Sequence, residues 1–347
     1  MHIGLRTLFA GIAMGALASV AGATQANAAA CSSPYVKGDV FASVGSSTVD
    51  VFTPTGSLLC SLNDGTGSTF TTGSGFDSAG NFYVTNFSTG TVSKFNNSGT
   101  LVSGSFFTPA PGASVESLVN VSVGPFAGST FVGGAGAFIN QYDTSTGALI
   151  QTFTVAGGNG TGRTDWIDMA LDGHTMLYDG EGSIIKSFDL SANTQNADFS
   201  TAPAFDVFAL RVIPDGADKG DVLAADSGHA ILLDASGSII KTYTLPGNGG
   251  GDFSLNLDPN GTDFWTGDDA TGTLWEVNIS TGAIDEQWTT GTGGNTLFGV
   301  SVFGEITSSG GGGTIPEPST WVMMLAGFAG LGYMGYRKSQ TSAAIAA

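Results

Sequence analysis

The amino-acid sequence predicts an all-β fold, a six-bladed β-propeller whose closing blade is built from both ends of the domain. The first observation behind this prediction is composition, because 54 of the 347 residues are glycine and only 11% are charged. Turn formers and β-branched residues are abundant while strong helix formers are scarce. This balance disfavours helical bundles, coiled coils and most α/β enzymes. A hydrophobic content of 41% excludes wholesale disorder.

The second observation is a repeated unit, in which an apolar residue is followed by a short polar turn and two further apolar residues. Successive units begin 43, 47, 46, 45 and 44 residues apart. Each unit predicts a hairpin with a turn that glycine permits, and two more short strands precede it, which gives the four strands of a blade. A β-helix would repeat roughly every 20 residues, and a sandwich would show no such repeat. The units begin at Phe52, Phe95, Tyr142, Phe188, Leu233 and Val277, of which the Phe188 copy lacks glycine.

The third observation is the strand count, which predicts a closed ring. Five complete units fill residues 75–290, one strand remains at 297–304, and three strands remain within 36–62. Together these remnants make a sixth, split blade in a domain of residues 31–307, which removes the free edges that invite aggregation. The apolar residues and turn glycine of segment 75–84, GFDSAGNFYV, resemble those of NHL-type six-bladed propellers.

Residues 1–28 are expected to be a secretory signal peptide. One basic residue, Arg6, precedes an apolar stretch over 8–23, and Ala26-Asn27-Ala28 places small residues where signal peptidase requires them. The sequence therefore predicts Sec export and cleavage near Ala28. The alternative is a retained membrane helix, which the short and glycine-rich apolar run disfavours.

The C-terminal residues carry a second targeting pattern. A Gly/Ser linker over 308–314 leads to Pro316-Glu317-Pro318, an uncharged apolar run over 321–336, and then Arg337 and Lys338. Sixteen helical residues at about 1.5 Å each span roughly 24 Å, which is marginal for a bilayer core. The basic pair would remain cytoplasmic. An ordinary C-terminal anchor is the alternative interpretation.

Segment 315–338 closely resembles the PEP-CTERM sorting signal of Gram-negative bacteria, a tail that also occurs on some proteins classed as ice-binding. The resemblance implies recognition and removal by an exosortase, a transpeptidase-like membrane enzyme. It also implies anchoring in the inner membrane during transit, and then delivery to the cell surface or the extracellular matrix. An exopolysaccharide or another surface component is the expected partner there. Two features depart from the pattern: the basic cluster has only two residues, and an uncharged tail, 339–347, follows it.

The charge and the cysteines of the predicted domain suit an exported protein. Residues 31–307 hold 28 acidic and 7 basic residues, a net charge of −21, which argues against nucleic acid or anionic lipid as partners. An even cysteine pair in an oxidising compartment predicts a disulfide between Cys31 and Cys60, worth about 3 kcal/mol. The alternative is a lipoprotein acylated at Cys31, although the preceding residues 28–30 lack the usual leucine.

Polar side chains recur where the chain enters the innermost strand of successive blades. These positions surround one mouth of the central channel, so their oxygens could converge on Ca²⁺, which takes six to eight oxygen ligands. The alternative is that they only cap turns. The candidate ligands are Glu116, Asp165, Asp206, Asp252 and Asn295.

Catalytic patterns are weak. His174 and His229 fall in expected turns, and no Gly-x-Ser-x-Gly motif precedes a helix. Propellers of the gluconolactonase-like family hold a metal with Glu, Asn and Asp about five residues before the inner strand ends. Here only Asn120 and Asp168 come near that position, each one residue later. We therefore expect a binding or structural module without enzyme activity. The alternatives are a metal-dependent lactonase or hydrolase and a purely structural matrix protein.

Overall fold

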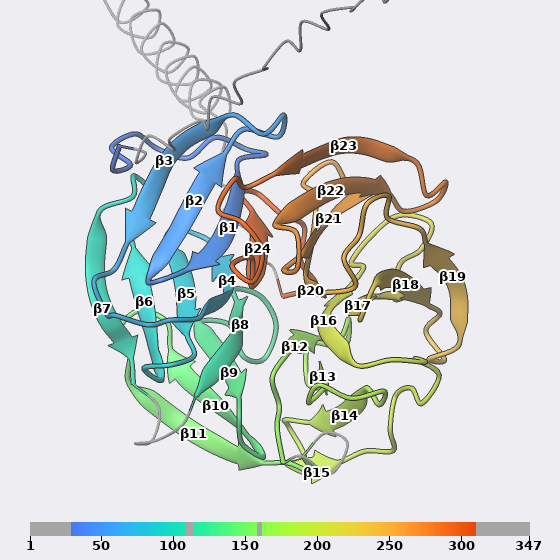
Figure 1. The fold of residues 1–347 in the computed structure, drawn as a ribbon. Helices are drawn as coiled ribbons and strands as arrows, with labels where there is room; N and C mark the ends of the chain where they lie inside the picture. The colour runs from blue at the N-terminus through green and yellow to red at the C-terminus, as the bar shows by residue number, and fades with distance from the viewer. Residues whose placement is uncertain (1–28, 109–113, 158–161, 310–347) are drawn as a thin grey trace, which may run out of the picture.

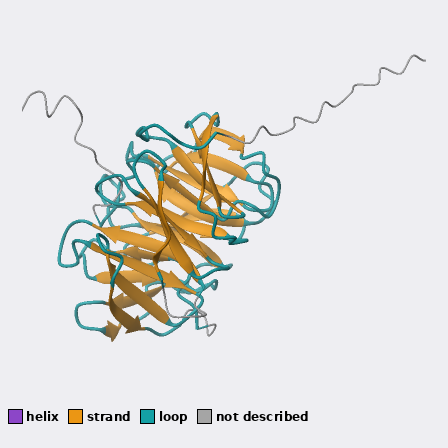
Figure 2. Ribbon diagram, turned by 90° about the vertical axis from the view of Figure 1, so that its left-hand side faces the viewer, coloured by secondary structure: helices purple, strands orange, loops and turns teal. Residues whose placement is uncertain are grey.

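The computed structural model describes residues 29–108, 114–157 and 162–309, so the predicted signal peptide and the PEP-CTERM-like segment lie outside the described residues. The described residues form 24 strands, arranged as six four-stranded antiparallel sheets around a central axis (Figure 1). Strands and loops make up the whole described body in side view (Figure 2). Over these ranges no helix has the length and apolar character needed to cross a membrane. The all-β propeller predicted from the sequence is confirmed.

Five blades are continuous in sequence, each running from the inner to the outer strand. Blade 1 is β4 (Thr71–Phe76), β5 (Phe82–Asn86), β6 (Thr91–Phe95) and β7 (Leu101–Phe107). Blade 2 is β8 (Val115–Val121), β9 (Ser129–Gly134), β10 (Phe138–Asp143) and β11 (Leu149–Thr154). Blade 3 is β12 (Ile167–Met169), β13 (Thr175–Tyr178), β14 (Lys186–Asp189) and β15 (Thr194–Gln195). Blade 4 is β16 (Val207–Val212), β17 (Val222–Asp226), β18 (His229–Leu233) and β19 (Ile239–Tyr243). Blade 5 is β20 (Asp252–Leu257), β21 (Asp263–Asp268), β22 (Thr273–Asn278) and β23 (Ile284–Thr289).

Blade 6 joins the two ends of the described chain, as the strand count predicts. Its inner strand is β24 (Gly299–Val302), which pairs antiparallel with β1 (Val40–Gly45) in the register Val40↔Val302. The sheet continues through β2 (Thr48–Phe52) to β3 (Leu58–Asn63). Figure 1 shows β24, at the red end of the colour scale, beside the blue β1. Because β24 also contacts β4 and β20, the ring of inner strands is closed.

Burial falls from the channel axis to the rim. Every residue of the inner strand β4 is buried, whereas the outer strand β23 alternates between half-buried and exposed positions. A strand covered on both faces takes a continuous run of small or apolar residues, and a strand with one wet face alternates. This difference explains why the inner strands give no period-two pattern in the sequence.

The turn glycines of the repeat are required by both conformation and space. Gly99, between β6 and β7, has φ +82°, and a Cβ there would lie 2.3 Å from the Cβ of Cys31, in the N-terminal segment that precedes β1 of blade 6. Only glycine adopts such a φ without strain. In blade 3, where glycine is missing, Asn193 holds the turn with φ +52°, and asparagine tolerates this region.

The N-terminal described residues cover the outer edge of blade 6. Cys31 and Cys60 form the disulfide expected from the sequence, with their Cα atoms 5.0 Å apart. The backbone N–H of Ser61, in β3, donates to the carbonyl of Ala29 at 3.0 Å. This covering blunts an edge strand that would otherwise present unpaired backbone groups.

Segment 303–309 follows β24 and closes the end of the channel at which the inner strands finish. Ser308 donates through its hydroxyl to the carbonyl of Met169, at the end of β12. The carbonyl of Ser309 accepts from the N–H of Ser122, directly after β8, at 2.8 Å. The segment therefore ties blade 6 to blades 2 and 3 across the axis.

Candidate functional site at the channel mouth

The predicted ligand residues all lie at one end of the channel, which we call the mouth and define as the end where the six inner strands begin. Glu116 is the second residue of β8, and Asp252 is the first residue of β20. Asp165 and Asp206 come just before β12 and β16, and Asn295 comes before β24. The structure does not, however, join these five residues in one ring.

The mouth carboxylate cluster, which we define as Glu116, Asp165, Asp179 and Glu181, surrounds Arg163. The Arg163 Nε atom donates to Asp165 Oδ2 at 2.5 Å, and Nη2 donates to Glu116 Oε2 at 3.2 Å. Both Glu181 oxygens contact the guanidinium, at 2.9 and 3.1 Å. Asp179, fully buried after β13, accepts the N–H of Glu181 at 3.2 Å. Blades 2 and 3 thus share a charged site to which four carboxylates contribute.

Burial dominates the electrostatics of this cluster. It raises the pKa of Glu116 well above the ordinary value, and the neighbouring charge of Asp165 raises that pKa further. Burial and then Asp165 have the same effect on the pKa of Asp179, because buried carboxylates that face one another resist ionisation. Asp165 Oδ1 and Asp179 Oδ2 have no hydrogen-bond partner among the described residues.

Asp252 belongs to a separate group on blade 5. Its Oδ2 atom accepts from Asn248 at 2.6 Å. Burial, opposed by this hydrogen bond and reinforced by the charges of Asp268, Asp226 and Asp269, raises the pKa of Asp252 to about 7. Asp268 is saturated with donors from the loops, including the N–H groups of residues 249, 251 and 270.

The other two predicted residues lie between or beside these groups. Asp206 is exposed, and its charge acts on Glu181 on one side and on Asp226 on the other. Asn295 is exposed in a turn with φ +59°, and its backbone N–H donates to the carbonyl of Asp269 at 2.6 Å. The structure therefore brings Glu116 and Asp165 together and separates them from Asp252 and Asn295.

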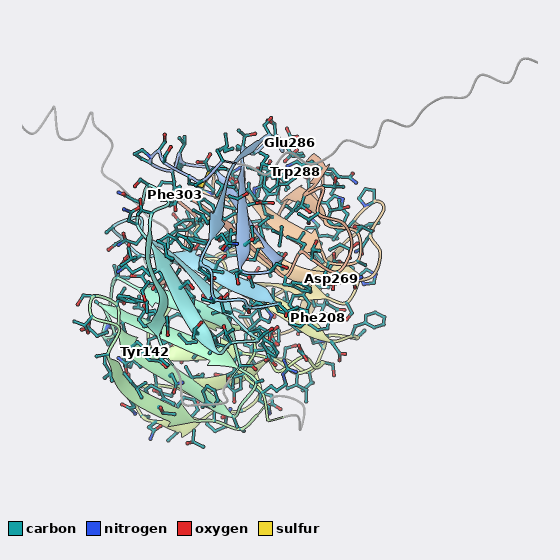
Figure 3. The ribbon with its side chains drawn as sticks, turned by 60° about the vertical axis from the view of Figure 1, so that its left-hand side comes forward. Tyr142, Phe208, Asp269, Glu286, Trp288 and Phe303 are labelled. Atoms are coloured by element: carbon teal, nitrogen blue, oxygen red, sulfur yellow. A yellow bond between two sulfur atoms is a disulfide. The ribbon has the colours of Figure 1, made fainter. Side chains whose placement is uncertain are left out.

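Aromatic rings make up another part of the mouth. We define the phenylalanine arc as Phe70, Phe298, Phe253 and Phe208, whose successive ring centroids are 5.1, 5.8 and 5.0 Å apart. Phe70 is 42% exposed. In Figure 3, Phe208 and Asp269 lie toward one side of the propeller, while Phe303, which follows β24, lies toward the other.

Two further contacts extend this aromatic surface. The Phe87 ring lies 6.4 Å from the Phe70 ring, and the Arg163 guanidinium lies 5.6 Å from the Phe87 centroid. Phe205, which is 50% exposed, stacks on His229 at 5.8 Å. The mouth thus combines exposed ring faces with carboxylate acceptors.

Asn120 and Asp168, on which the lactonase alternative rests, line a small cavity deeper in the channel together with Arg211 and Glu305. The Asp168 oxygens accept the N–H groups of Met169 and Val212 at 2.9 and 2.7 Å. Burial, opposed by the charge of Arg211, raises the pKa of Glu305 to about 8. These side chains hold inner strands and segment 303–309 together.

Sequence reasoning missed Arg163, Glu181 and the phenylalanine arc. Arg163 stands two residues before Asp165 in a chain with only 10 lysines and arginines, so its position beside a carboxylate was a usable signal. The phenylalanine arc had a weaker signal: Phe253 is the second residue of β20 and Phe298 directly precedes β24, so both lie where adjacent blades enter their inner strands. Glu181 gave no signal in the sequence, because it follows the second strand of its blade, whereas the predicted ligands lie at the start of the first strand.

Comparison with known proteins supports the targeting pattern. Residues 314–338 match the PEP-CTERM protein-sorting motif. A stretch of 96 residues is 32% identical to a protein named transcription factor unc-37 from Caenorhabditis elegans, and it covers 28% of this chain and 15% of that protein. Because the match covers so little of that protein, it says nothing about the activity of this chain. The resemblance to NHL-type propellers remains a prediction. The chain therefore joins a six-bladed β-propeller to a PEP-CTERM sorting motif.

Proposed function

We propose that this protein is a binding module of the cell surface or extracellular matrix, and that its mouth holds a sugar unit of a matrix polysaccharide. The PEP-CTERM motif at residues 314–338 implies exosortase-dependent export and surface sorting in Gram-negative bacteria. Removal of the chain from about Trp321 onward belongs to this proposal, and the intact mass of the exported protein tests it.

The phenylalanine arc is the observation that carries the proposal. A sugar ring has an apolar face of C–H groups that stacks on an aromatic ring, and hydroxyl groups that need acceptors. Ligand sites commonly combine aromatic walls with a few placed polar groups. The mouth offers Phe70 as an exposed face, with Asp206 and Asp269 as accessible acceptors on the same end of the channel.

Charge narrows the class of sugar. The chain has a formal net charge of −19, and the mouth holds two groups of carboxylates against one arginine. An anionic polymer rich in uronic acids would be repelled. A neutral or amine-bearing sugar would not be repelled, and both the carboxylates and the aromatic faces would attract an ammonium group.

No enzyme activity forms part of this proposal. Both Asp168 oxygens are engaged by backbone donors, and Asn120 Oδ1 accepts from Thr130 at 2.6 Å. A metal-dependent lactonase remains testable, since turnover that is lost on changing Asn120 or Asp168 would place the protein in the enzyme class.

Calorimetric titration of the exported protein in chelator tests sugar binding. Three probes of similar length are compared: a glucosamine oligomer, a neutral glucose oligomer and a guluronate oligomer. We expect the first two to bind and Phe70→Ala to weaken them about threefold to tenfold, because one aromatic contact is lost. Leu149→Ala, an exposed apolar change on the outer strand β11, is the matched control. Absence of all binding would leave a structural role, and preference for the anionic oligomer would contradict the proposal.

A further inference from the structure

The mouth carboxylate cluster carries more negative charge than its arginine can balance. Four carboxylates, Glu116, Asp165, Asp179 and Glu181, act on one guanidinium. Arg163 directs its contacts to Asp165 Oδ2, Glu116 Oε2 and both Glu181 oxygens. With all groups ionised, the cluster keeps a net charge of −3, so either protons or a further cation must stabilise it.

The geometry of the cluster suits a metal ion. Glu116, Asp165 and Glu181 each offer an oxygen, and these oxygens all lie within 4.8 Å of one another. A cation that binds oxygens at 2.3–2.6 Å holds ligands on opposite sides about 5 Å apart. Within the described ranges, these residues are the group of three or more acidic, histidine or cysteine side chains that converges in this way.

Unpaired buried oxygens are an independent sign of a missing ligand. Asp165 and Asp179 are both 0% exposed, and neither Asp165 Oδ1 nor Asp179 Oδ2 has a donor among the described residues. The N–H of Asp179 donates to the carbonyl of Trp166, next to Asp165, at 3.0 Å, and Asp179 accepts the N–H of Glu181, so the second unpaired group lies beside the cluster. A buried acceptor left without a donor destabilises the folded protein, and more so when it is charged.

We infer that the mouth carboxylate cluster is a calcium site, with Glu116, Asp165 and Glu181 as ligands and Asp179 as a supporting charge. Arg163 contacts one oxygen each of Asp165 and Glu116, which leaves their second oxygens for the metal, whereas Glu181 would share an oxygen between the metal and the guanidinium. Ca²⁺ fits better than Mg²⁺ because it accepts several carboxylates in flexible geometry, whereas Mg²⁺ keeps most of its waters. The purely oxygen donor set also disfavours zinc, which prefers nitrogen and sulfur.

This inference is independent of sugar binding. The calcium test uses the metal alone, and the sugar test uses the protein in chelator, so either can fail without the other. The predicted ring of five residues would instead have used Asp252, which the structure places in a different group with its own donors.

Calorimetric titration of the chelator-treated exported protein with CaCl₂ tests the site. We expect one Ca²⁺ per chain, a higher melting temperature with Ca²⁺, and at least tenfold weaker binding in Asp165→Asn and Glu181→Gln. Asp252→Asn is the matched control, since it is equally buried at the same mouth but should bind Ca²⁺ like the wild type. Glu181 is partly exposed, so its variant stays informative if Asp165→Asn fails to fold.

Asp179→Asn separates a metal site from a structural cluster. It removes one buried charge and keeps an oxygen that can accept the N–H of Glu181. We expect this variant to have a higher melting temperature than the wild type in chelator, and a smaller rise in melting temperature when Ca²⁺ is added. Lack of Ca²⁺ binding at millimolar concentration, or equal binding by the wild type, Asp165→Asn and Glu181→Gln, would overturn the inference.

Discussion

Asp252 begins β20 with a fully buried carboxyl group, and its pKa is raised to about 7 by burial and by neighbouring aspartates. In the unfolded chain the same group titrates near 3.8. Between these values the folded protein binds the proton and the unfolded chain does not, so stability falls as pH rises from about 4 to about 7. Three pKa units correspond to an upper bound of roughly 4 kcal/mol.

Asp252→Asn should therefore flatten this part of the pH dependence. We expect the variant to be more stable than the wild type at pH 8 and to lose most of that advantage by pH 5, as measured by urea unfolding at intervals of one pH unit. Asp143→Asn is the control with the opposite sign. Side-chain and backbone donors of Ser145 and Thr146 lower the Asp143 pKa to about 2. The folding stability that this carboxylate contributes is therefore lost only as the pH falls below about 4. Parallel curves for the wild type and Asp252→Asn would contradict the prediction.

The residues of the mouth were predictable from the sequence only where the repeat carried them. Register placed Glu116, Asp165 and Asp252 at the mouth because each enters an inner strand. It could not group them, since grouping depends on side-chain partners. Arg163 forms ion pairs with Glu116 of blade 2 and Asp165 of blade 3. Asp252 instead has Asn248 and the aspartates of blade 5 as neighbours.

At the scale of elements, the turn between the third and fourth strands fixes how neighbouring blades meet. Gly99→Ala should cost about 2–4 kcal/mol, because the new Cβ would strike Cys31 and φ is +82°. Gly65→Ala is the matched control, since Gly65 has φ +67° but nothing within 4 Å of a Cβ, so it should cost only about 1–2 kcal/mol of strain. If urea unfolding shows equal losses of stability in the two variants, the contact between blades does not contribute to the cost of Gly99→Ala.

The hairpins were predictable because their turn chemistry repeats, and even the glycine-free copy at Phe188 forms one through Asn193. The beginning of blade 1 was less predictable. β4 begins at Thr71, four residues before the expected Gly75, and its pairing with β5 shifts register between Thr71 and Ser74. A bulge of this kind adds residues without changing the apolar pattern that follows.

For the whole molecule, closure through β24 should decide whether the domain folds. A chain ending at Ser309 keeps every described strand, whereas a chain ending at Thr290 loses β24 and exposes the edge of β1 that pairs with it. We expect the first to melt cooperatively as a monomer and the second to aggregate or stay unfolded. Circular dichroism melts and size-exclusion chromatography check this. A cooperative, monomeric product from the shorter chain would refute the closing role of β24.

The whole fold could be predicted because a period near 45 residues constrains both strand number and closure. Segment 303–309 could not, since it belongs to no repeat. Its place depends on Glu305 entering the channel beside Arg211, and on the Ser308 and Ser309 contacts with blades 3 and 2. Such contacts follow from the assembled ring and leave no local pattern in the sequence.

The described chain ends at Ser309, on the face opposite the mouth, where its carbonyl accepts from Ser122. Eleven residues, 310–320, separate Ser309 from Trp321, where the predicted membrane-spanning run begins. Fully extended, they reach at most about 40 Å. If residues 321–336 span the membrane as predicted, the propeller is tethered by its plugged face, and the mouth lies at the end away from the tether. Under the proposed function, a tether on that face leaves the mouth free to bind a polysaccharide, and the proposed removal of the tail would not alter the binding residues.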